Sequence, residues 1–260
     1  MLLKADDVTV RYAGHCALKT FSLGLGQGEI VALIGPNGSG KSTALHALAG
    51  LTRPDTGDVR LDGRSVRAWK RRHLARRLSF LPQAPLAPEG LTVAQLVRHG
   101  RFAHVGLFGS FTAEDRRAVE WALESTDLVD LADRDLRALS GGERQRAWIA
   151  AALAQEAAFL LLDEPTSFLD IGHQVEVLEL LCRLRRERQM TVVVAIHDLN
   201  QAMAIADQIM LLARGETVFC GGARALSGSG LIEATFGVNG AFEHRQDGAG
   251  RVSFNAHIAI

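Results

Sequence analysis

The stretch that decides the fold is Gly35-Pro36-Asn37-Gly38-Ser39-Gly40-Lys41-Ser42-Thr43, which fits the phosphate-loop pattern G-x-x-x-x-G-K-[ST] at every fixed position. The apolar run 29–34 before it predicts a buried strand, and the segment 43–49 after it predicts a helix that ends near Gly50. Glycines allow successive backbone N–H groups to point at one centre, and the N-terminus of the helix adds a partial positive charge. We therefore expect this loop to bind the phosphates of a nucleoside triphosphate.

Two residues of the loop have more specific expected roles. Lys41 can reach the β- and γ-phosphates, and the Ser42 hydroxyl can ligate Mg²⁺. A glycine-rich turn that binds nothing is the alternative, but the ordered series of strand, loop, Lys-Ser pair and helix disfavours it. The loop alone does not choose among kinases, GTPases, motors and transport ATPases.

Composition narrows the class of protein. The chain has 260 residues, a formal net charge of zero and 47% apolar residues, so it can bury a large α/β core and has no global attraction for nucleic acid. No apolar run approaches the roughly 20 residues of a membrane span, and the N-terminus lacks a signal-peptide pattern. Three scattered cysteines indicate reduced thiols rather than a disulfide framework. The expected compartment is the cytosol or the cytosolic face of a membrane.

The rest of the chain falls into segments with different residue patterns. Short alternating strands in 2–33 and 57–63 predict an antiparallel sheet, and the basic run 64–77 predicts a helix with a solvated basic face. Contact of that run with acidic lipid or a partner protein is the alternative. Segment 84–155 reads as an α-helical insert between two core strands. Beyond Gly221 the pattern weakens, and 247–250 predicts the turn of a short hairpin.

An acidic pair follows the predicted strand 159–162. Such a strand delivers Asp163 to the edge of the sheet, where a carboxylate can hold Mg²⁺ through water. Glu164 is then placed to polarise a water in line with the γ-phosphorus. A solvated acidic strand end is the alternative, and the phosphate loop earlier in the chain disfavours it.

A second glycine-rich helix start lies at Leu139-Ser140-Gly141-Gly142-Glu143-Arg144-Gln145-Arg146. Ser140 and Glu143 have the spacing of a capping box, which predicts that a helix begins here. Gly141 and Gly142 leave the N–H groups of the helix start uncovered, so the sequence predicts a second end that can bind an anion.

Together these stretches resemble the nucleotide-binding subunit of ATP-binding cassette (ABC) transporters, over about residues 2–222. The resemblance implies an α/β fold: a P-loop NTPase core with an antiparallel β subdomain and an inserted α-helical subdomain at 84–155. Residues 1–222 would then form the ATPase domain and 223–260 a C-terminal extension. ATP and Mg²⁺ are the implied cofactors, and ATP hydrolysis coupled to transport is the implied activity.

The resemblance also implies a role for each matched residue. Gly35–Thr43 resembles the Walker A loop, and Asp163 with Glu164 ends a stretch that resembles Walker B. The implied catalytic residues are Glu164, His197, Gln83 and Lys41, and the implied Mg²⁺ ligands are Ser42, Gln83 and Asp163. The implied nucleotide contacts outside the loop are an adenine-stacking Tyr12, the signature residues Ser140, Gly141, Gly142 and Gln145, and Asp170 of the D-loop.

The likeness is greatest to ferric-siderophore importer ATPases, at 143–150, 163–174, 197–202 and in the Gly100-Arg101 and Gly106–Gly109 segments. Haem and cobalamin importer ATPases are near relatives, and a soluble ABC protein without a permease or a P-loop kinase is a weaker alternative. The resemblance implies a head-to-tail dimer with a second copy of the chain, because each chain carries one Walker A and one signature. It also implies docking on permease subunits through Gln83 and 84–109, an indirect link to a substrate-binding protein, no nucleic-acid partner, and a peripheral location on the cytoplasmic face of the membrane.

Overall fold

The computed structural model describes residues 2–85, 89–106, 109–244 and 252–257. These residues form two compact units, one built from Met1–Arg67 with Thr191–Ile260 and the other from Ala68–Met190. The first unit therefore carries the phosphate loop and His197, and the second carries Gln83, the acidic pair and the signature stretch. None of the helices formed by the described residues is long and apolar enough to cross a membrane.

The first unit contains the predicted antiparallel sheet. Its strands run in the order β2-β1-β4-β5, with bounds β1 Leu3–Tyr12, β2 His15–Leu25, β4 Thr56–Leu61 and β5 Arg64–Ser65. β1 is central and pairs antiparallel with β2 and with β4. Residues facing the core alternate along β2, from Leu18 and Phe21 to Leu23 and Leu25, as expected of a sheet with one solvated face.

A parallel sheet in the same unit places the phosphate loop. β3 (Ile30–Ile34) lies between β8 (Thr191–Ala195) and β9 (Gln208–Ala213) and is parallel to both, while β10 (Glu216–Gly221) runs antiparallel to β9. β3 and β8 are buried along their whole length, which is typical of strands covered on both faces. Leu33 pairs with Ala195, so the residues that follow β3 and β8 emerge at one edge of the sheet.

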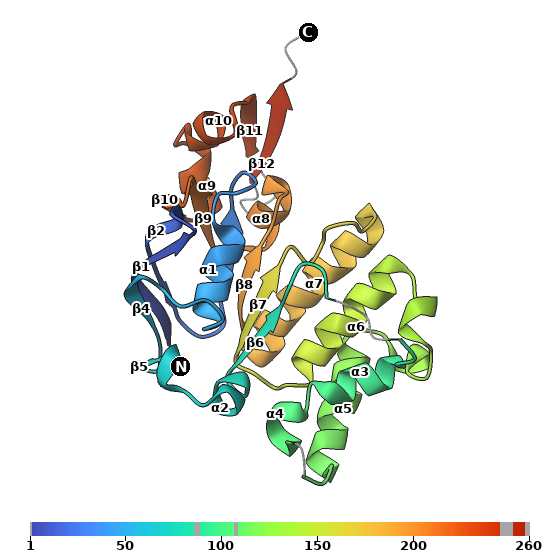
Figure 1. The fold of residues 1–260 in the computed structure, drawn as a ribbon. Helices are drawn as coiled ribbons and strands as arrows, with labels where there is room; N and C mark the ends of the chain where they lie inside the picture. Colours follow the sequence, from blue (N-terminus) through green and yellow to red (C-terminus); the bar gives the residue numbers. More distant parts are fainter. Residues whose placement is uncertain (1, 86–88, 107–108, 245–251, 258–260) are drawn as a thin grey trace. The chain divides into compact units, whose positions relative to one another are not determined.

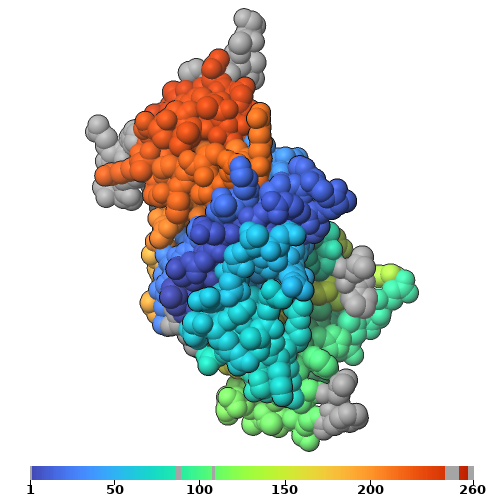
Figure 2. Space-filling view, turned by 60° about the vertical axis from the view of Figure 1, so that its left-hand side comes forward, coloured from blue at the N-terminus to red at the C-terminus, as the bar shows by residue number. Residues whose placement is uncertain are grey.

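Helices and a C-terminal hairpin complete the first unit. The helices are α1 Lys41–Leu48, α8 Leu199–Ile205, α9 Ala223–Ser227 and α10 Leu231–Phe236, and the hairpin strands are β11 Asn239–His244 and β12 Val252–His257. β12 packs on α8 and α9, as Figure 1 also shows. The orange and red C-terminal elements lie on the same unit as the dark blue N-terminal strands in Figure 2. The hairpin is confirmed, but its predicted turn at 247–250 lies outside the described residues.

The second unit is mainly helical. Its two strands, β6 Leu78–Leu81 and β7 Phe159–Asp163, are parallel, and Leu81 pairs with Leu162. Gln83 and Glu164 therefore leave these strands at the same edge. The helices are α2 Arg71–Ala75, α3 Val93–His99, α4 Phe102–Val105, α5 Ala113–Ser125, α6 Gly141–Leu153 and α7 Ile171–Arg188, with short 3₁₀ turns at Val129–Leu131 and Leu136–Ala138. Another 3₁₀ turn, Val66–Ala68, spans the point in the sequence where the first unit gives way to the second.

The predicted helix over the basic run 64–77 is wrong. The run forms β5, a 3₁₀ turn and the five-residue helix α2 before β6 begins. Two of its cations are also not simply solvated, because Arg72 and Arg76 donate to the carbonyl oxygens of Ala103 and His104 in α4. These guanidinium groups satisfy carbonyls that a four-residue helix leaves without internal partners, which local periodicity cannot reveal.

A buried ion pair fixes the helices of the second unit. Arg101 is 2% exposed, and its Nε lies 2.9 Å from Asp115 Oδ1. One terminal nitrogen donates to Glu156 at 2.5 Å and to the Ala154 carbonyl oxygen at 2.8 Å. The cluster therefore joins the start of α4, the first turn of α5 and the end of α6.

Acid should weaken this cluster. Burial raises the pKa of Asp115, but hydrogen bonds from Thr112 and Arg101 outweigh it and lower the pKa from 3.8 to about 2. Because the folded state holds the proton less tightly than the unfolded state, the carboxylate stabilises the fold fully above pH 3.8, and this contribution is lost as the pH falls towards 2. We expect Asp115→Asn to destabilise the protein near neutral pH and progressively less in acid. Urea unfolding with exposed Asp133→Asn as control measures this; a pH-independent difference would contradict it.

Candidate functional site

The phosphate loop requires glycine at two positions. Gly35 has φ +146°, and a Cβ there would lie 2.1 Å from the Leu212 carbonyl oxygen. Gly40 has φ +105°, and its Cβ would lie 2.6 Å from the Ala17 carbonyl oxygen. The backbones of neighbouring strands thus lie against both ends of the loop. A side chain at either glycine would clash with them and distort the loop. The loop leads directly into α1, as the sequence predicted.

Polar groups inside the loop are suited to an anion. Lys41 is 5% exposed, and its ammonium donates to the carbonyl oxygens of Gly35 at 2.9 Å and Pro36 at 3.2 Å. The buried Ser39 hydroxyl has no hydrogen-bond partner among the described residues. A buried hydroxyl without a partner is destabilising, so a ligand oxygen at this position would satisfy it. Ser42 and Thr43 follow Lys41 in the first turn of α1, where N–H groups are unused by the helix.

Two further predicted residues belong to the same unit as the loop. His197 follows β8 and is exposed, and the pairing of Leu33 with Ala195 puts it at the sheet edge from which the loop emerges. Tyr12 ends β1 with 47% of its surface exposed, and its hydroxyl lies 3.2 Å from Thr52 Oγ1. The ring of Tyr12 is therefore available for stacking, while its hydroxyl is held.

The second unit brings Gln83 and Glu164 into contact. The Gln83 side-chain amide donates to Glu164 Oε2 at 2.5 Å, and the Ser167 hydroxyl donates to the same oxygen at 3.2 Å. Glu164 is 8% exposed and has φ +51°, a conformation that costs energy for a residue with a side chain. Asp163, at the end of β7, is 5% exposed. A carboxylate held by two donors in a strained turn is well placed to orient and polarise a water.

The signature stretch forms the predicted helix start. Glu143 N–H donates to the Ser140 hydroxyl at 3.2 Å, and Ser140 N–H donates to a Glu143 carboxylate oxygen at 2.7 Å, which confirms the capping box. Hydrogen bonds to the Glu143 carboxylate from the Ser140 backbone N–H and side chain lower the pKa of Glu143 below its usual value. Gln145 lies one turn further along α6 and is partly exposed. The stretch therefore presents the N-terminus of a full helix.

Two residues without a predicted role support this part of the site. A Cβ on Gly142 would lie 2.0 Å from the His173 ring, so only glycine lets α6 approach that side chain. His173 Nδ1 lies 2.8 Å from a carboxylate oxygen of Asp170, the residue that caps α7. The second of these residues is Ser167, whose hydroxyl donates a hydrogen bond to the Glu164 carboxylate. The spacing of Asp170 and His173 at the start of a helix was the only sequence signal for this pairing.

Comparisons with known proteins agree with these features. The sequence model of the ABC transporter family matches residues 18–167. The chain is 40% identical over 237 residues to the iron(3+)-hydroxamate import ATP-binding protein FhuC of Bacillus subtilis (strain 168), covering 91% of this chain and 88% of that protein. It is 41% identical over 236 residues to the ferric enterobactin transport ATP-binding protein FepC of Escherichia coli (strain K12), covering 91% and 87%.

Solved structures of ABC transporters and their cassettes also match this chain. An ABC transporter assigned to the metal-chelate type, in an inward-facing conformation, matches with a TM-score of 0.86 and 31% identity over 98% of this chain and 97% of that one. A bacterial ABC transporter cassette solved as a dimer matches with a TM-score of 0.74 and 31% identity over 84% and 97%.

Proposed function

This chain belongs to the ABC transporter family and is an ATPase of that family, and from this premise we propose that it energises the import of a ferric siderophore through a membrane permease. The observation that carries the proposal is the similarity, over about nine-tenths of the chain, to import ATP-binding proteins named for iron chelates. The glycine-walled loop and the Gln83–Glu164 contact are what an ATP-hydrolysing subunit needs.

We assign the steps of hydrolysis to this chain's own residues. The loop 35–43 and Lys41 bind the phosphates, and Tyr12 stacks on the adenine. Glu164 accepts a proton from the attacking water, and Gln83 and Ser167 hold its carboxylate in place. His197 contacts the γ-phosphate. Ser42, Asp163 and Gln83 would hold Mg²⁺, which would neutralise charge on the phosphates.

We propose that a second copy of the chain completes each site, with Ser140, Gly141, Gly142 and Gln145 of one copy facing nucleotide on the other. An exposed apolar row supports a protein partner next to Asp170: Phe168 is 91% exposed, Ile171 80% and Val175 46%. Apolar side chains gathered in this way mark interaction surfaces. The dimeric solved cassette gives the expected kind of assembly.

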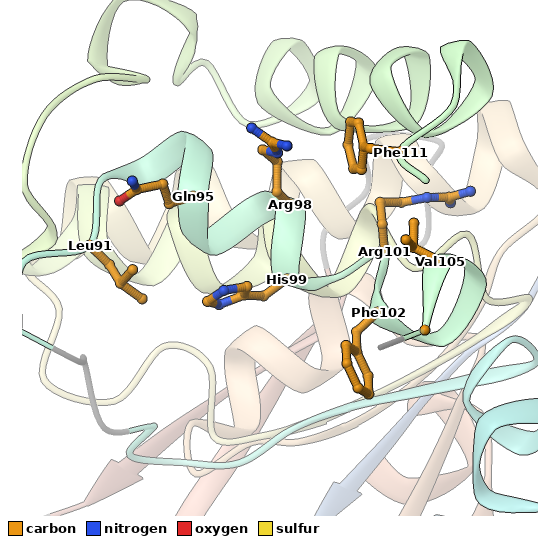
Figure 3. A pocket seen from close by; sticks show the side chains of 9 residues that line it. Leu91, Gln95, Arg98, His99, Arg101, Phe102, Val105 and Phe111 are labelled. Atoms are coloured by element: carbon orange, nitrogen blue, oxygen red, sulfur yellow. The ribbon is translucent and has the colours of Figure 1, made fainter. Parts of the chain in front are cut away.

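We further propose that the helical insert docks on the permease. A pocket of about 350 Å³ lies within it, lined by residues that include Leu91, Gln95, Arg98, Phe102 and Phe111 (Figure 3). Phe102 is 59% exposed, and the Arg98 guanidinium stands 4.5 Å from the centroid of the Phe111 ring. A permease segment with an apolar side chain next to a carboxylate would suit this lining, because the pocket offers both aromatic rings and a guanidinium group. Leu107 and Phe108, part of the predicted docking segment, lie outside the described residues.

The remaining predictions follow from this role. We place the protein on the cytoplasmic face of the cell membrane, as a peripheral subunit that reaches a substrate-binding protein only through the permease. We divide the chain into an ATPase domain at 1–222, with the helical insert at 84–155, and an extension at 223–260. Haem or cobalamin is the alternative cargo, because importers of these chelates are near relatives.

Deletion of the gene tests the cargo. We expect the deletion strain to lose growth under iron limitation when one or more ferric siderophores are the iron source, because closure of the ATPase pair no longer drives the permease. Haem and cobalamin serve as parallel sources. The wild-type gene should restore growth, and Glu164→Gln should not. A strain impaired only with haem or only with cobalamin would replace the siderophore by that cargo.

A further inference from the structure

One side chain of α8, that of Asn200, holds the middle of β12 in the C-terminal hairpin. The Asn200 amide donates to the Phe254 carbonyl oxygen at 3.1 Å, and its oxygen accepts from Phe254 N–H at 2.7 Å. Asn200 lies in the first turn of α8 and Phe254 in the middle of β12, which run beside each other in Figure 1. Both main-chain polar groups of Phe254 are thus held by a single amide, 54 residues away in sequence.

Phe254 is itself packed within the hairpin. The residue is 9% exposed, and its ring lies 4.9 Å, centroid to centroid, from the ring of Phe242 on β11. Val252 on the same strand is 6% exposed. A Cβ on Gly240 would lie 2.2 Å from the tip of the Phe254 ring, so the opposite strand has room only for glycine there. Asn200 is therefore attached to a packed strand rather than to a loose tail.

Asn200 is also connected to the turn that carries His197, through its backbone N–H. Asp198 caps α8, and its Oδ1 accepts from Asn200 N–H at 2.7 Å and from Gln201 N–H at 3.1 Å. On the strand side, Ile196 N–H donates to the Leu33 carbonyl oxygen at 3.1 Å, two residues before the phosphate loop. The turn 196–200 is thus held at one end by the loop's own strand and at the other by the hairpin.

We propose that Asn200 is a positioning residue for ATP hydrolysis, and that the C-terminal hairpin is the support against which it sets the His197 turn. The inference rests on the proposed contact of His197 with the γ-phosphate. The residues that we expect to bind the phosphates lie in the loop and in α1 rather than in α8, so we expect loss of the Asn200 support to leave ATP affinity intact. A displaced imidazole, in contrast, slows the chemical step, because a misplacement of about 1 Å can cost about a hundredfold in rate.

The experiment measures kcat for ATP hydrolysis and ATP affinity by calorimetry in the full-length protein. Asn200→Ala removes both bonds to Phe254, and we expect kcat to fall about tenfold or more while the Kd for ATP changes less than about twofold. Asn200→Asp keeps only the acceptor, adds a charge that favours a helix N-terminus, and should give an intermediate kcat. Asn255→Ala, the same change at an exposed position on β12, is the control and should be silent.

A remote variant tests whether the hairpin acts through Asn200. Gly240→Ala places a Cβ against the Phe254 ring, so it should displace that residue and lower kcat with ATP affinity kept. Combined with Asn200→Ala it should add no further loss, because the connection is already broken. Additive losses would overturn the proposal, as would parallel losses of kcat and ATP affinity.

The variant His197→Ala tests the proposed contact with the γ-phosphate separately from the role of Asn200. His197→Ala should lower kcat at least as far as Asn200→Ala. If His197→Ala loses activity and Asn200→Ala does not, the positioning role fails alone. If His197→Ala keeps wild-type kcat, the contact of His197 with the γ-phosphate fails, and the positioning role fails with it.

Discussion

Glu164→Gln is expected to reduce steady-state ATP hydrolysis by at least about a hundredfold, the usual contribution of a general base, while ATP still binds. The amide preserves the shape of the side chain and can accept a hydrogen bond, but it cannot take a proton from the attacking water. The donors Gln83 and Ser167, which hold one carboxylate oxygen, both remain in place. Because turnover stops after binding, ATP and Mg²⁺ should also hold two subunits together, which size-exclusion chromatography detects.

A matched variant makes this result specific. Glu187→Gln is the same substitution at an exposed position of α7 and should leave both the rate and the elution volume unchanged. Wild-type hydrolysis by Glu164→Gln would remove this residue from its proposed role. Lost hydrolysis together with lost ATP binding would indicate a damaged fold instead.

Features defined by neighbouring residues were predictable from sequence. The loop glycines, the helix that follows them and the capping box of Ser140 and Glu143 depend on contacts within a few residues, and spacing alone reveals them. The ABC ATPase fold class is confirmed by solved structures of the family, and ATP hydrolysis is the activity of that family. The bounds of β3 and β7 differ from the predicted ones by one residue.

Contacts between distant segments were not predictable. Arg72 and Arg76 donate to the carbonyl oxygens of α4 about 30 residues later. The bond between Gln83 and Glu164 spans 81 residues, and that between Asn200 and Phe254 spans 54. Hydrophobic periodicity reports which face of an element is buried, but not which polar group on another element meets it. The resemblance to a family named Gln83 and Glu164, whereas the roles of Ser167, His173 and Asn200 came from geometry.

Shared sites should make two inactive subunits active when they are paired. Lys41→Ala removes a charge-assisted contact to the phosphates and should weaken ATP binding about tenfold to a hundredfold. Ser140→Arg puts a bulky cation at the start of α6, where a partner's γ-phosphate would dock, and Ser140→Ala controls for loss of the cap alone. Each variant alone should hydrolyse almost no ATP. In a head-to-tail heterodimer, both lesions fall in one site and the other site is intact.

The reciprocal pairing decides between shared and separate sites. With both substitutions on one chain and a wild-type partner, a shared arrangement leaves a lesion in each site, whereas separate sites leave the wild-type chain intact. We therefore expect tag-purified heterodimers with one lesion on each chain to keep up to about half of the wild-type rate, and the reciprocal heterodimers to keep almost none. The opposite order of activities would show that each chain builds its site alone. Loss of activity in both pairings would mean that hydrolysis needs two intact sites. The subunit with the Ser140→Arg lesion still carries a complete phosphate loop, so a damaged loop on that subunit would not explain the loss.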